Sequence, residues 1–564
     1  MAESSAINLR SGGVEGLKKS AMKKNPASTR RAASAMAAVL SAANLAFLSA
    51  CAANPGPPPV VEDNASALQE DQATTTAKQQ EEPPQDADSA KRPTISVGVD
   101  PLRAGLNPHL VANNSELVDQ IAELVLPSTF HGGQRDADIL ESAAEVNAPK
   151  GVAQRVRYVI ASPAQWSDGT PISGADFSYL WKQMTTTAGV RDPAGYHAIS
   201  AVNTSDGGRV VTVDFSQKVK DWHLLFHNLL PSHLLQDDNF GSALADKIPA
   251  SAGRFLVDSV DRGRGVITLN RNDRFWGANP AQVDVIQLSE VRDSTQALNM
   301  LRSGQIGFAD FTPDQTSEEA LGLLGHVSEK ALTRPRQLRL HMSTAEGALE
   351  ERAARRGLAS LIDTDQVARL ATGRASNLEP GNNPISKDTD LTALRTRASK
   401  KPIRFAVDPT SPTALAAANT LYDVLEAHGI DAEVVSERLT TITSKLLPEG
   451  SVDAVVTWED ISLNSLAAAN IFSCDNKEPL AGDLSGICPE NADEIRKDIL
   501  SGAMSPKEAL RRIREVNSKE ALYVPLMDET RIHALGKGIL GPGQSIDDWD
   551  EGLITAPRWR IDED

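Results

Sequence analysis

Few residues in this sequence have the type and spacing that catalysis would need. Two of the histidines, His223 and His227, lie four apart, so a helix would put both imidazoles on one face, where they could bind zinc. No third ligand lies near them in the sequence, which favours a packing or surface role. Gly-x-Ser-x-Gly, His-Glu-x-x-His and Walker patterns are absent. We therefore expect a protein that is not an enzyme and has no catalytic residues, no cofactor and no metal site.

The three cysteines of the chain are Cys51, Cys474 and Cys488. If Cys51 carries a lipid, the other two form an even pair, separated by a short polar loop that contains Gly and Pro. In an oxidising compartment such a pair predicts a disulfide. The alternative, a metal site built on both cysteines, lacks a nearby histidine or a second cysteine pair.

Cys51 directly follows a segment that is typical of a bacterial export signal. The first fifty residues carry seven basic and two acidic side chains, and residues 32–47 carry no charge. This uncharged stretch is too short and too rich in Ala and Ser for a permanent span, which takes about 20 apolar residues. The pattern Leu-Ser-Ala-Cys that ends at Cys51 resembles a lipobox, in which the cysteine receives a diacylglycerol and the chain is cleaved ahead of it.

We therefore expect residues 1–50 to be a lipoprotein signal peptide, with Met22 as an alternative true start. Cys51 would then anchor the protein by lipid to the extracytoplasmic face of the cell membrane. An ordinary cleavage site, with Cys51 as an unmodified residue, is the alternative. Residues 52–92 are rich in Pro, Gln, Glu, Asp and Ala and almost free of aromatic residues. Such a segment buries too little apolar surface to fold, so we expect residues 51–92 to be the lipidated cysteine and a disordered linker.

The charge of the chain bears on its partners. The formal net charge is −18, and removing the +5 of the first fifty residues leaves about −23. Binding to nucleic acid through general electrostatics needs clusters of Lys and Arg. We therefore expect no nucleic acid among the partners.

Hydrophobic patterning predicts the elements of the remaining chain. Alternating or continuous apolar residues predict strands at 95–99, 156–160, 211–215, 403–407, 430–435, 453–458 and 522–526. Ser173 and Asp176 have the spacing of a capping box at the start of a helix, and Pro412 opens another helix between two predicted strands. The β-α-β-α-β order after residue 403 predicts a parallel sheet with helices on both faces.

Five segments, in order along the chain, resemble the extracytoplasmic solute-binding proteins of family five, which include oligopeptide and dipeptide receptors. They are residues 166–177, with a Trp-x-Asp-Gly-x-Pro turn, and residues 252–255, 269–276, 296–306 and 358–369. The resemblance implies a two-lobed α/β fold of the periplasmic-binding-protein type (class II, cluster C), with a hinge and an interlobe cleft. Lobe I would comprise residues 94–334 with 522–564, and lobe II residues 335–521.

Further segments resemble one group within this family, a lipoprotein of mycobacteria and corynebacteria. They are residues 97–100, 105–110, 124–130, 189–196 and 228–235. This resemblance implies regulation of lipomannan and lipoarabinomannan synthesis through membrane mannosyltransferases that use polyprenyl-phosphate mannose. The family fold alone implies the alternative, the substrate-binding component of an ABC peptide importer with a permease as partner. The ligand would be a glycolipid or a peptide, and we expect a monomer.

The same resemblance points to two ligand-binding candidates. Peptide receptors of the family hold the free α-amino group with an Asp that follows a Trp by a few residues, which here indicates Trp458 and Asp460. The Pro and the second Asp of that stretch are absent, and Asp460 lies one place early. A salt bridge needs its carboxylate in register, so an exposed carboxylate at a strand end is the alternative for Asp460.

Overall fold

The computed structural model describes residues 92–387, 389–461, 464–472, 484–543 and 545–562. The signal peptide, Cys51, the linker and Cys474 lie outside these ranges. The lipid anchor, the disordered linker and the disulfide between Cys474 and Cys488 therefore stay predictions. Within the described ranges, no helix is both long enough and apolar enough to cross a bilayer.

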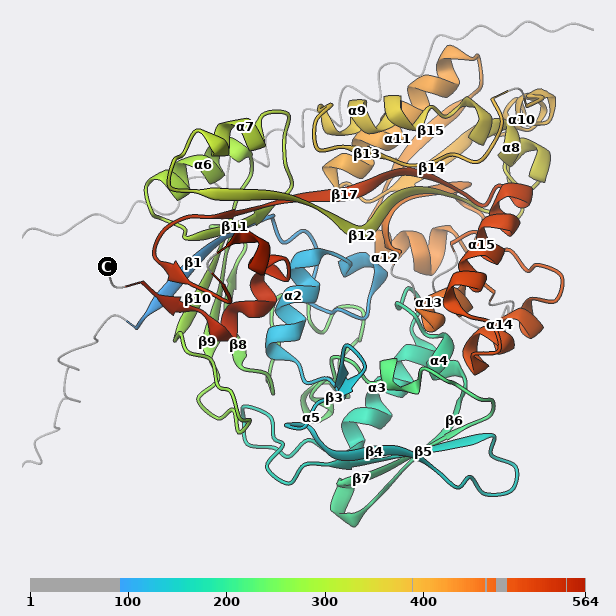
Figure 1. Ribbon diagram of the computed structural model, residues 1–564. Helices are drawn as coiled ribbons and strands as arrows, with labels where there is room; N and C mark the ends of the chain where they lie inside the picture. Colours follow the sequence, from blue (N-terminus) through green and yellow to red (C-terminus); the bar gives the residue numbers. More distant parts are fainter. Residues whose placement is uncertain (1–91, 388, 462–463, 473–483, 544, 563–564) are drawn as a thin grey trace, which may run out of the picture. The chain divides into compact units, whose positions relative to one another are not determined.

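Strands that are far apart in the sequence form one mixed sheet of eleven strands (Figure 1). Its order is β15-β14-β16-β12-β17-β11-β1-β10-β9-β8, and β13 pairs with β17. Two long antiparallel strands, β12 (Ser328–Met342) and β17 (Tyr523–Leu535), lie in its middle and run from one half of the sheet into the other. The other strands are β1 (Thr94–Val99), β8 (Phe255–Asp261), β9 (Val266–Arg271), β10 (Val285–Glu290), β11 (Phe308–Phe311), β13 (Glu379–Pro380), β14 (Ile403–Val407), β15 (Ala432–Ser436) and β16 (Ala454–Asp460).

The predicted parallel strands after residue 403 are confirmed, since β14 pairs in parallel with both β15 and β16. Their side chains alternate between two apolar clusters, as the period of a strand requires. Phe405 and Val456 pack with α11 (Pro412–Ala427) on one face. Ala406 and Val455 pack on the other face with α12 (Leu439–Thr441) and η4 (Ile442–Leu446). Helices α8 (Arg352–Leu361), α9 (Thr364–Thr372) and α10 (Thr392–Ala398) add to the cluster of α11.

The first half of the chain adds a second, antiparallel sheet with the order β4-β5-β7-β6. These strands are β4 (Leu140–Val146), β5 (Gln154–Ile160), β6 (Ile199–Ser205) and β7 (Val210–Phe215). Helix α3 (Gly174–Thr186) packs on the sheet through Phe177 and Leu180, which are fully buried. Its capping box is confirmed, because the Ser173 amide donates to Asp176 Oδ2 at 2.9 Å and the Ser173 hydroxyl caps the first turn.

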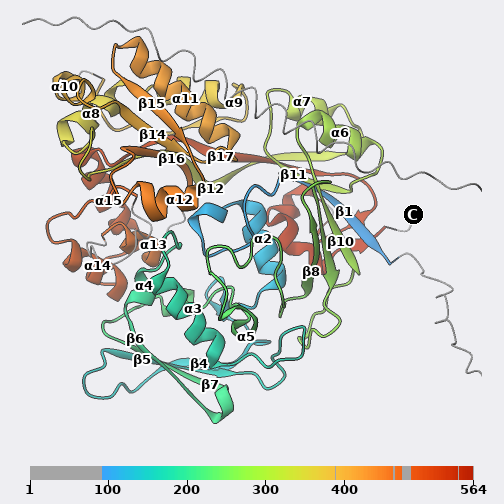
Figure 2. The same ribbon diagram turned by 180° about the vertical axis from the view of Figure 1, so that it is seen from behind.

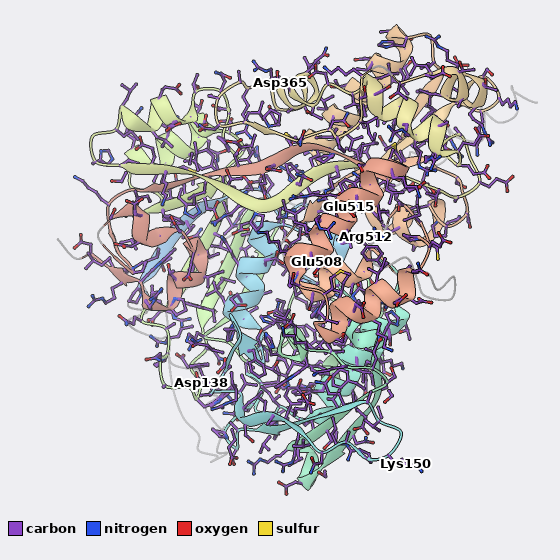
Figure 3. All side chains as sticks on the ribbon, turned by 45° about the vertical axis from the view of Figure 1, so that its right-hand side comes forward. Asp138, Lys150, Asp365, Glu508, Arg512 and Glu515 are labelled. Carbon is purple, nitrogen blue, oxygen red and sulfur yellow. The ribbon has the colours of Figure 1, made fainter. Side chains whose placement is uncertain are left out.

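Helices near the C-terminal end of the chain pack beside elements from the first half. Figures 1 and 2 both show α13 (Ser465–Asn470) and α14 (Ala492–Ser501) beside α4 (Ala194–His197). α15 (Pro506–Glu520) buries Ile513 in the apolar cluster to which α4, α13 and α14 also contribute. It exposes Glu508, Arg512 and Glu515 (Figure 3). The remaining elements are η1 (Val111–Asn113), α2 (Glu116–Val125), β2 (Phe130–His131), β3 (Gln134–Arg135), η2 (Asp206–Gly208), η3 (Trp222–Leu224), α5 (Ser232–Leu235), α6 (Ser294–Arg302), α7 (Ser317–Gly322), β18 (Ile539–Leu540), η5 (Ile546–Trp549), η6 (Gly552–Arg558) and β19 (Arg560–Ile561).

Removing the buried carboxylate of Asp176 tests how the start of α3 is held. Asp176 is 2% exposed, and besides Ser173 it accepts the amide of Ser232 at 3.0 Å and the Ser232 hydroxyl at 2.7 Å. Asp176→Ala leaves these buried donors without an acceptor, so we expect the free energy of unfolding to fall by about 2–4 kcal/mol in urea titrations followed by tryptophan fluorescence.

The matched control is Asp365→Ala. Asp365 also lies in the first turn of a helix, α9, but its side chain is 54% exposed and pairs with Arg369 one turn further on (Figure 3). An exposed pair of this kind contributes about 0.3–0.5 kcal/mol. Equal losses for the two variants would contradict the role given to Asp176.

Candidate functional site

Two adjoining cavities lie beside the middle of the large sheet. The polar cavity is lined by charged residues that include Asp100, Arg103, Glu116, Arg336, Arg374, Asp408, Glu529 and Arg531. The second cavity, called the apolar cavity, has apolar walls that include Ile461, Ala468, Ile471, Leu510, Ile513 and Tyr523, together with five charged residues, Arg191, Asp192, Arg339, Glu459 and Asp460. Val111, Asn114, Thr457 and Trp458 line both cavities. A ligand that reaches from one cavity to the other would therefore pass Trp458.

The structure places both ligand-binding candidates at the apolar cavity. Trp458 lies near the end of β16, and the Arg336 guanidinium carbon is 5.8 Å from the centre of its ring. Asp460 is the last residue of β16, and its Oδ2 lies 3.2 Å from Nη2 of Arg191. The carboxylate of Asp460 is thus partly buried and ion-paired, unlike a free carboxylate at an exposed strand end. That Trp458 and Asp460 bind a ligand stays a prediction.

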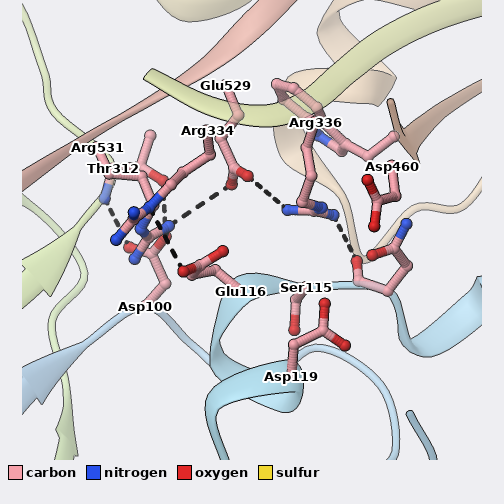
Figure 4. A network of polar contacts seen from close by, with 12 residues as sticks. Asp100, Ser115, Glu116, Asp119, Thr312, Arg334, Arg336, Asp460, Glu529 and Arg531 are labelled. Carbon is pink, nitrogen blue, oxygen red and sulfur yellow. Dashed lines mark hydrogen bonds and ion pairs between the residues drawn. The ribbon is translucent and has the colours of Figure 1, made fainter. Parts of the chain in front are cut away.

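Arg336 joins the middle of the sheet to the start of α2 (Figure 4). It projects from β12, and its Nη1 donates to Glu529 Oε2 on β17 at 2.7 Å. Its Nη2 donates to the carbonyl oxygen of Asn114, just ahead of α2, at 2.6 Å. Only 7% of the Arg336 side chain is exposed, so the ion pair with Glu529 is shielded from solvent and fixes one wall of the polar cavity.

Arg531 is the second buried guanidinium of this network and projects from β17. Its Nε donates to Asp310 on β11 at 2.5 Å. Its Nη1 donates to Asp100 at 2.8 Å (Figure 4). Burial alone would raise the pKa of Asp310, but the charges and hydrogen bonds of Arg531 and His533 together outweigh it and hold that pKa well below its usual range. Asp100 also accepts the Thr312 hydroxyl at 2.6 Å. Three segments, β17, β11 and the end of β1, are thus held together through one arginine.

Glu116, in the first turn of α2, has a longer ion pair than Asp100, Asp310 and Glu529 have. Its Oε1 lies 3.4 Å from Nε of Arg334 on β12. Burial raises the pKa of Glu116, and the nearby Arg334 lowers it only in part. The carboxylate therefore faces the polar cavity with a reduced preference for its charged form.

Two adjacent residues of opposite charge, Arg191 and Asp192, line the apolar cavity. Arg191 donates to Asp119 Oδ1 on α2 at 2.7 Å, as well as pairing with Asp460. The next residue, Asp192, has a positive φ of 49° and accepts a hydrogen bond from Asn470 Nδ2 at 2.9 Å. Burial raises the pKa of Asp192 to about 6, although the adjacent Arg191 favours its charged form.

The two histidines that suggested a metal pair do not lie on one helix. Element η3 ends at Leu224, so His223 and His227 are not separated by a turn of helix. His227 Nδ1 lies 3.2 Å from the Ser128 hydroxyl, and His223 packs against the ring of Phe130. In the part of the chain that the structure describes, no three His, Cys, Asp or Glu side chains form a cluster that could hold a metal ion.

Most charged residues of the site were not identified from the sequence. Arg336 and Glu529 are 193 positions apart, and only the pairing of β12 with β17 brings them together. One signal was present, since Arg334, Arg336 and Arg339 interrupt an apolar strand that ends in Leu340 and Met342. Charged residues inside a strand at the centre of a sheet require partners, because burial of an unpaired charge is costly.

Comparison with known families gives a match for the middle of the chain. Residues 154–390 match the model of bacterial extracellular solute-binding proteins, family 5 Middle. The chain is similar to the "Probable monoacyl phosphatidylinositol tetramannoside-binding protein LpqW" of Mycobacterium tuberculosis, with 29% identity over 454 residues. That alignment covers 68% of this chain and 71% of the relative. The "Oligopeptide-binding protein OppA" of Mycobacterium bovis is 27% identical over 292 residues, covering 49% of this chain and 48% of the relative.

Solved structures show the fold. The oligopeptide-binding protein AppA of Bacillus subtilis, in complex with a nonapeptide, is 13% identical and superposes with a TM-score of 0.63, covering 84% of this chain and 100% of AppA. The periplasmic EDTA-binding protein EppA is 19% identical with a TM-score of 0.62, covering 85% of this chain and 99% of EppA. The predicted two-lobed α/β fold of the periplasmic-binding-protein type is thereby confirmed. These neighbours are binding proteins rather than enzymes.

Replacing Asp192 by Asn tests the raised pKa at the apolar cavity. The pKa of Asp192 is about 6 in the folded protein and 3.8 ordinarily. Between these two pH values the folded protein therefore keeps a proton on Asp192 that the unfolded chain has lost. The stability from this proton is fully present below pH 3.8 and is lost as the pH rises through about 6. Asp192→Asn removes the charge and keeps an acceptor for Asn470.

At pH 7 we expect Asp192→Asn to raise the free energy of unfolding by about 1–2 kcal/mol in urea titrations, a difference that shrinks toward pH 4. Asn also tolerates a positive φ, so the backbone is not strained further. The matched control is Asp493→Asn, an exposed carboxylate in the first turn of α14, which should leave stability unchanged. Wild-type stability or lower for Asp192→Asn at pH 7 would contradict the assigned pKa.

Proposed function

We propose that the chain, which matches the extracellular solute-binding proteins of family 5 over residues 154–390, binds an amphiphilic glycolipid and regulates lipoglycan synthesis at the cell membrane. The observation that carries the proposal is the apolar cavity that adjoins the polar cavity at Trp458. An acyl chain gains free energy from apolar walls, whereas sugar and phosphate groups need hydrogen-bond partners and charges. The two cavities offer these two environments side by side.

The name of the relative LpqW states the ligand class, a monoacyl phosphatidylinositol tetramannoside. Such a molecule has fatty acyl chains, two on the glycerol of its phosphatidyl group and one further acyl group, and a polar head of sugars and phosphate. Tyr523, Leu510 and Ile513 would contact an acyl chain in the apolar cavity. The head would then lie in the polar cavity, whose walls carry hydroxyl, carboxylate and guanidinium groups.

The ion pair of Asp460 bears on the choice between a glycolipid and a peptide. A peptide receptor of this family would use the carboxylate to hold the ammonium group of its ligand. Here Arg191 forms an ion pair with that carboxylate at 3.2 Å and a second ion pair with Asp119. A peptide would have to displace a guanidinium that is held from two sides, which favours a ligand without an ammonium group.

The regulatory part of the proposal concerns the partner. We take it to be a membrane mannosyltransferase that uses polyprenyl-phosphate mannose, reached from a lipid anchor on Cys51 through the linker of residues 51–92. Tethering both proteins to one membrane raises their effective concentration for each other. The lobes proposed for ligand closure are residues 94–334 with 522–564 and residues 335–521, and the protein would act as a monomeric binding protein without catalysis.

The similarity to OppA supports a second candidate function. In it the chain is the substrate-binding component of an ABC peptide importer and delivers its ligand to a permease. AppA, which has the same fold, is in complex with a nonapeptide. Under this alternative, Trp458 and Asp460 would contact the peptide.

A charge placed in the apolar cavity should separate these two functions. Leu510→Asp puts a carboxylate where an acyl chain would lie, so we expect the affinity for lysophosphatidylinositol, measured by isothermal titration calorimetry, to fall by at least about 10-fold. Ser518→Asp adds the same charge on an exposed position of α15 and should leave the affinity unchanged. Wild-type protein that binds a set of penta- to nonapeptides but no lysophosphatidylinositol would establish the importer role instead.

Deleting the gene tests the regulatory role. We expect less or shorter lipomannan and lipoarabinomannan on gels of extracted lipoglycans, because the partner mannosyltransferases would lose their regulator. Restoring the gene as Cys51→Ala should give a folded protein that does not restore the wild-type pattern. Unchanged lipoglycans in the deletion strain would refute the regulatory role, and full restoration by Cys51→Ala would refute the need for the membrane anchor.

A further inference from the structure

The carboxylates that line the polar cavity are each neutralised from within the protein. Asp100 pairs with Arg531 at 2.8 Å, Glu529 with Arg336 at 2.7 Å and Glu116 with Arg334 at 3.4 Å. Asp408 accepts the backbone amides of Thr410 and Leu439, both at 2.9 Å, and lies 3.6 Å from Arg438. Each of these acidic residues thus has a basic partner, and Arg531 is shared between Asp100 and the buried Asp310.

Two arginines that line the same cavity have only neutral partners. Arg103 donates from Nη1 to the carbonyl oxygen of Thr410 at 3.1 Å. Arg374 donates to the carbonyl oxygen of Pro313 at 3.2 Å and to the Thr530 hydroxyl at 2.7 Å. Among the described residues neither forms an ion pair. Arg103 and Arg374 are therefore the two arginines of the described cavity wall that no ion pair engages.

Arg374 is the more deeply buried of the two. It is 5% exposed, and its Nε is shielded from solvent and has no hydrogen-bond partner. Burial lowers the pKa of Arg374 to about 10, and the charge of Asp314 offsets this only in part. A buried cation outside an ion pair is unfavourable, and an anion in the cavity would relieve this cost.

Two helices present their N-terminal ends to the same cavity. Ser115, Glu116 and Leu117 line it from the start of α2, and Ser411 and Thr413 line it from the start of α11. The unpaired amides of a first turn and the helix dipole both favour an anion there. α2 comes from the proposed lobe I and α11 from the proposed lobe II, so one anion could contact both.

We propose that the polar cavity is an anion site in which Arg103 and Arg374, together with the ends of α2 and α11, bind the phosphodiester of an amphiphilic ligand. The proposal rests on the proposed function for the class of ligand. With the phosphate in this place, the acyl chain lies beyond Trp458 in the apolar cavity. The two cavities then favour an amphiphile with an anionic head over a neutral lipid with the same acyl chain.

The test compares two lipids that differ in the phosphate. Lysophosphatidylinositol and a monoacylglycerol with the same acyl chain are titrated calorimetrically into the full mature protein. Arg103→Gln and Arg374→Gln should each weaken lysophosphatidylinositol binding by about 10-fold or more and change monoacylglycerol binding by less than about 2-fold. The control is Arg512→Gln on the outer face of α15, where Arg512 pairs with Glu515 at 3.4 Å (Figure 3); it should change neither.

A third probe, inorganic phosphate, distinguishes the source of the anion. If the site binds a lipid head group, inorganic phosphate should not compete with lysophosphatidylinositol at equal concentration. Full competition would show a site for free phosphate and overturn the assignment. Arg374→Lys keeps the charge and should recover part of the affinity. If Arg374→Gln does not fold, Arg103→Gln, at an exposed position, carries the test.

The outcomes separate this inference from the function on which it rests. Wild-type protein that binds neither lipid would refute the glycolipid function. Tight lipid binding that is insensitive to both arginine variants, or an equal loss for both lipids, would refute the anion site and leave the function standing.

Discussion

The two central strands carry charged side chains into the interior, and these charges must be neutralised where they lie. Arg531 on β17 is 3% exposed, and it persists there because Asp310 on β11 and Asp100 after β1 meet it at 2.5 and 2.8 Å. Arg336 on β12 meets Glu529 in the same way. Removing one partner of such a pair costs about 3–5 kcal/mol, because the other charge stays buried. The register of β12 against β17 is therefore tied to the geometry of the polar cavity.

The need to neutralise these buried charges also explains why the site has a polar and an apolar cavity. The internal ion pairs engage the acidic residues of the polar cavity together with Arg336 and Arg531, whereas Arg103 and Arg374 are in no ion pair and can contact a ligand. The apolar cavity follows the strand end at Trp458 and takes its walls from α13 and α15, which carry their apolar faces into the same cluster. Arg191 then links α2 to Asp460 in the wall of the apolar cavity. Together these contacts suit an amphiphile better than a peptide with a free ammonium group.

Local patterns were enough to predict the elements but not the site. Alternation at Ile403, Phe405 and Val407 and the capping spacing of Ser173 and Asp176 predicted elements that the structure contains, because both signals depend on neighbours a few residues away. The family resemblance predicted the fold and drew attention to Trp458 and Asp460, which do line the apolar cavity. The partners of these residues could not be found in this way. Arg191 and Asp460 are 269 positions apart, and no local periodicity encodes which strand end meets which loop.

The central claim is that one ligand occupies both cavities, with its charge in one and its chain in the other. A crystal structure of the mature protein with lysophosphatidylinositol tests this most directly. The account predicts the acyl chain between Leu510, Ile513 and Tyr523, and a phosphate oxygen within hydrogen-bond distance of Arg103 or Arg374. A lipid bound on the outer surface, or a phosphate placed away from both arginines, would contradict it.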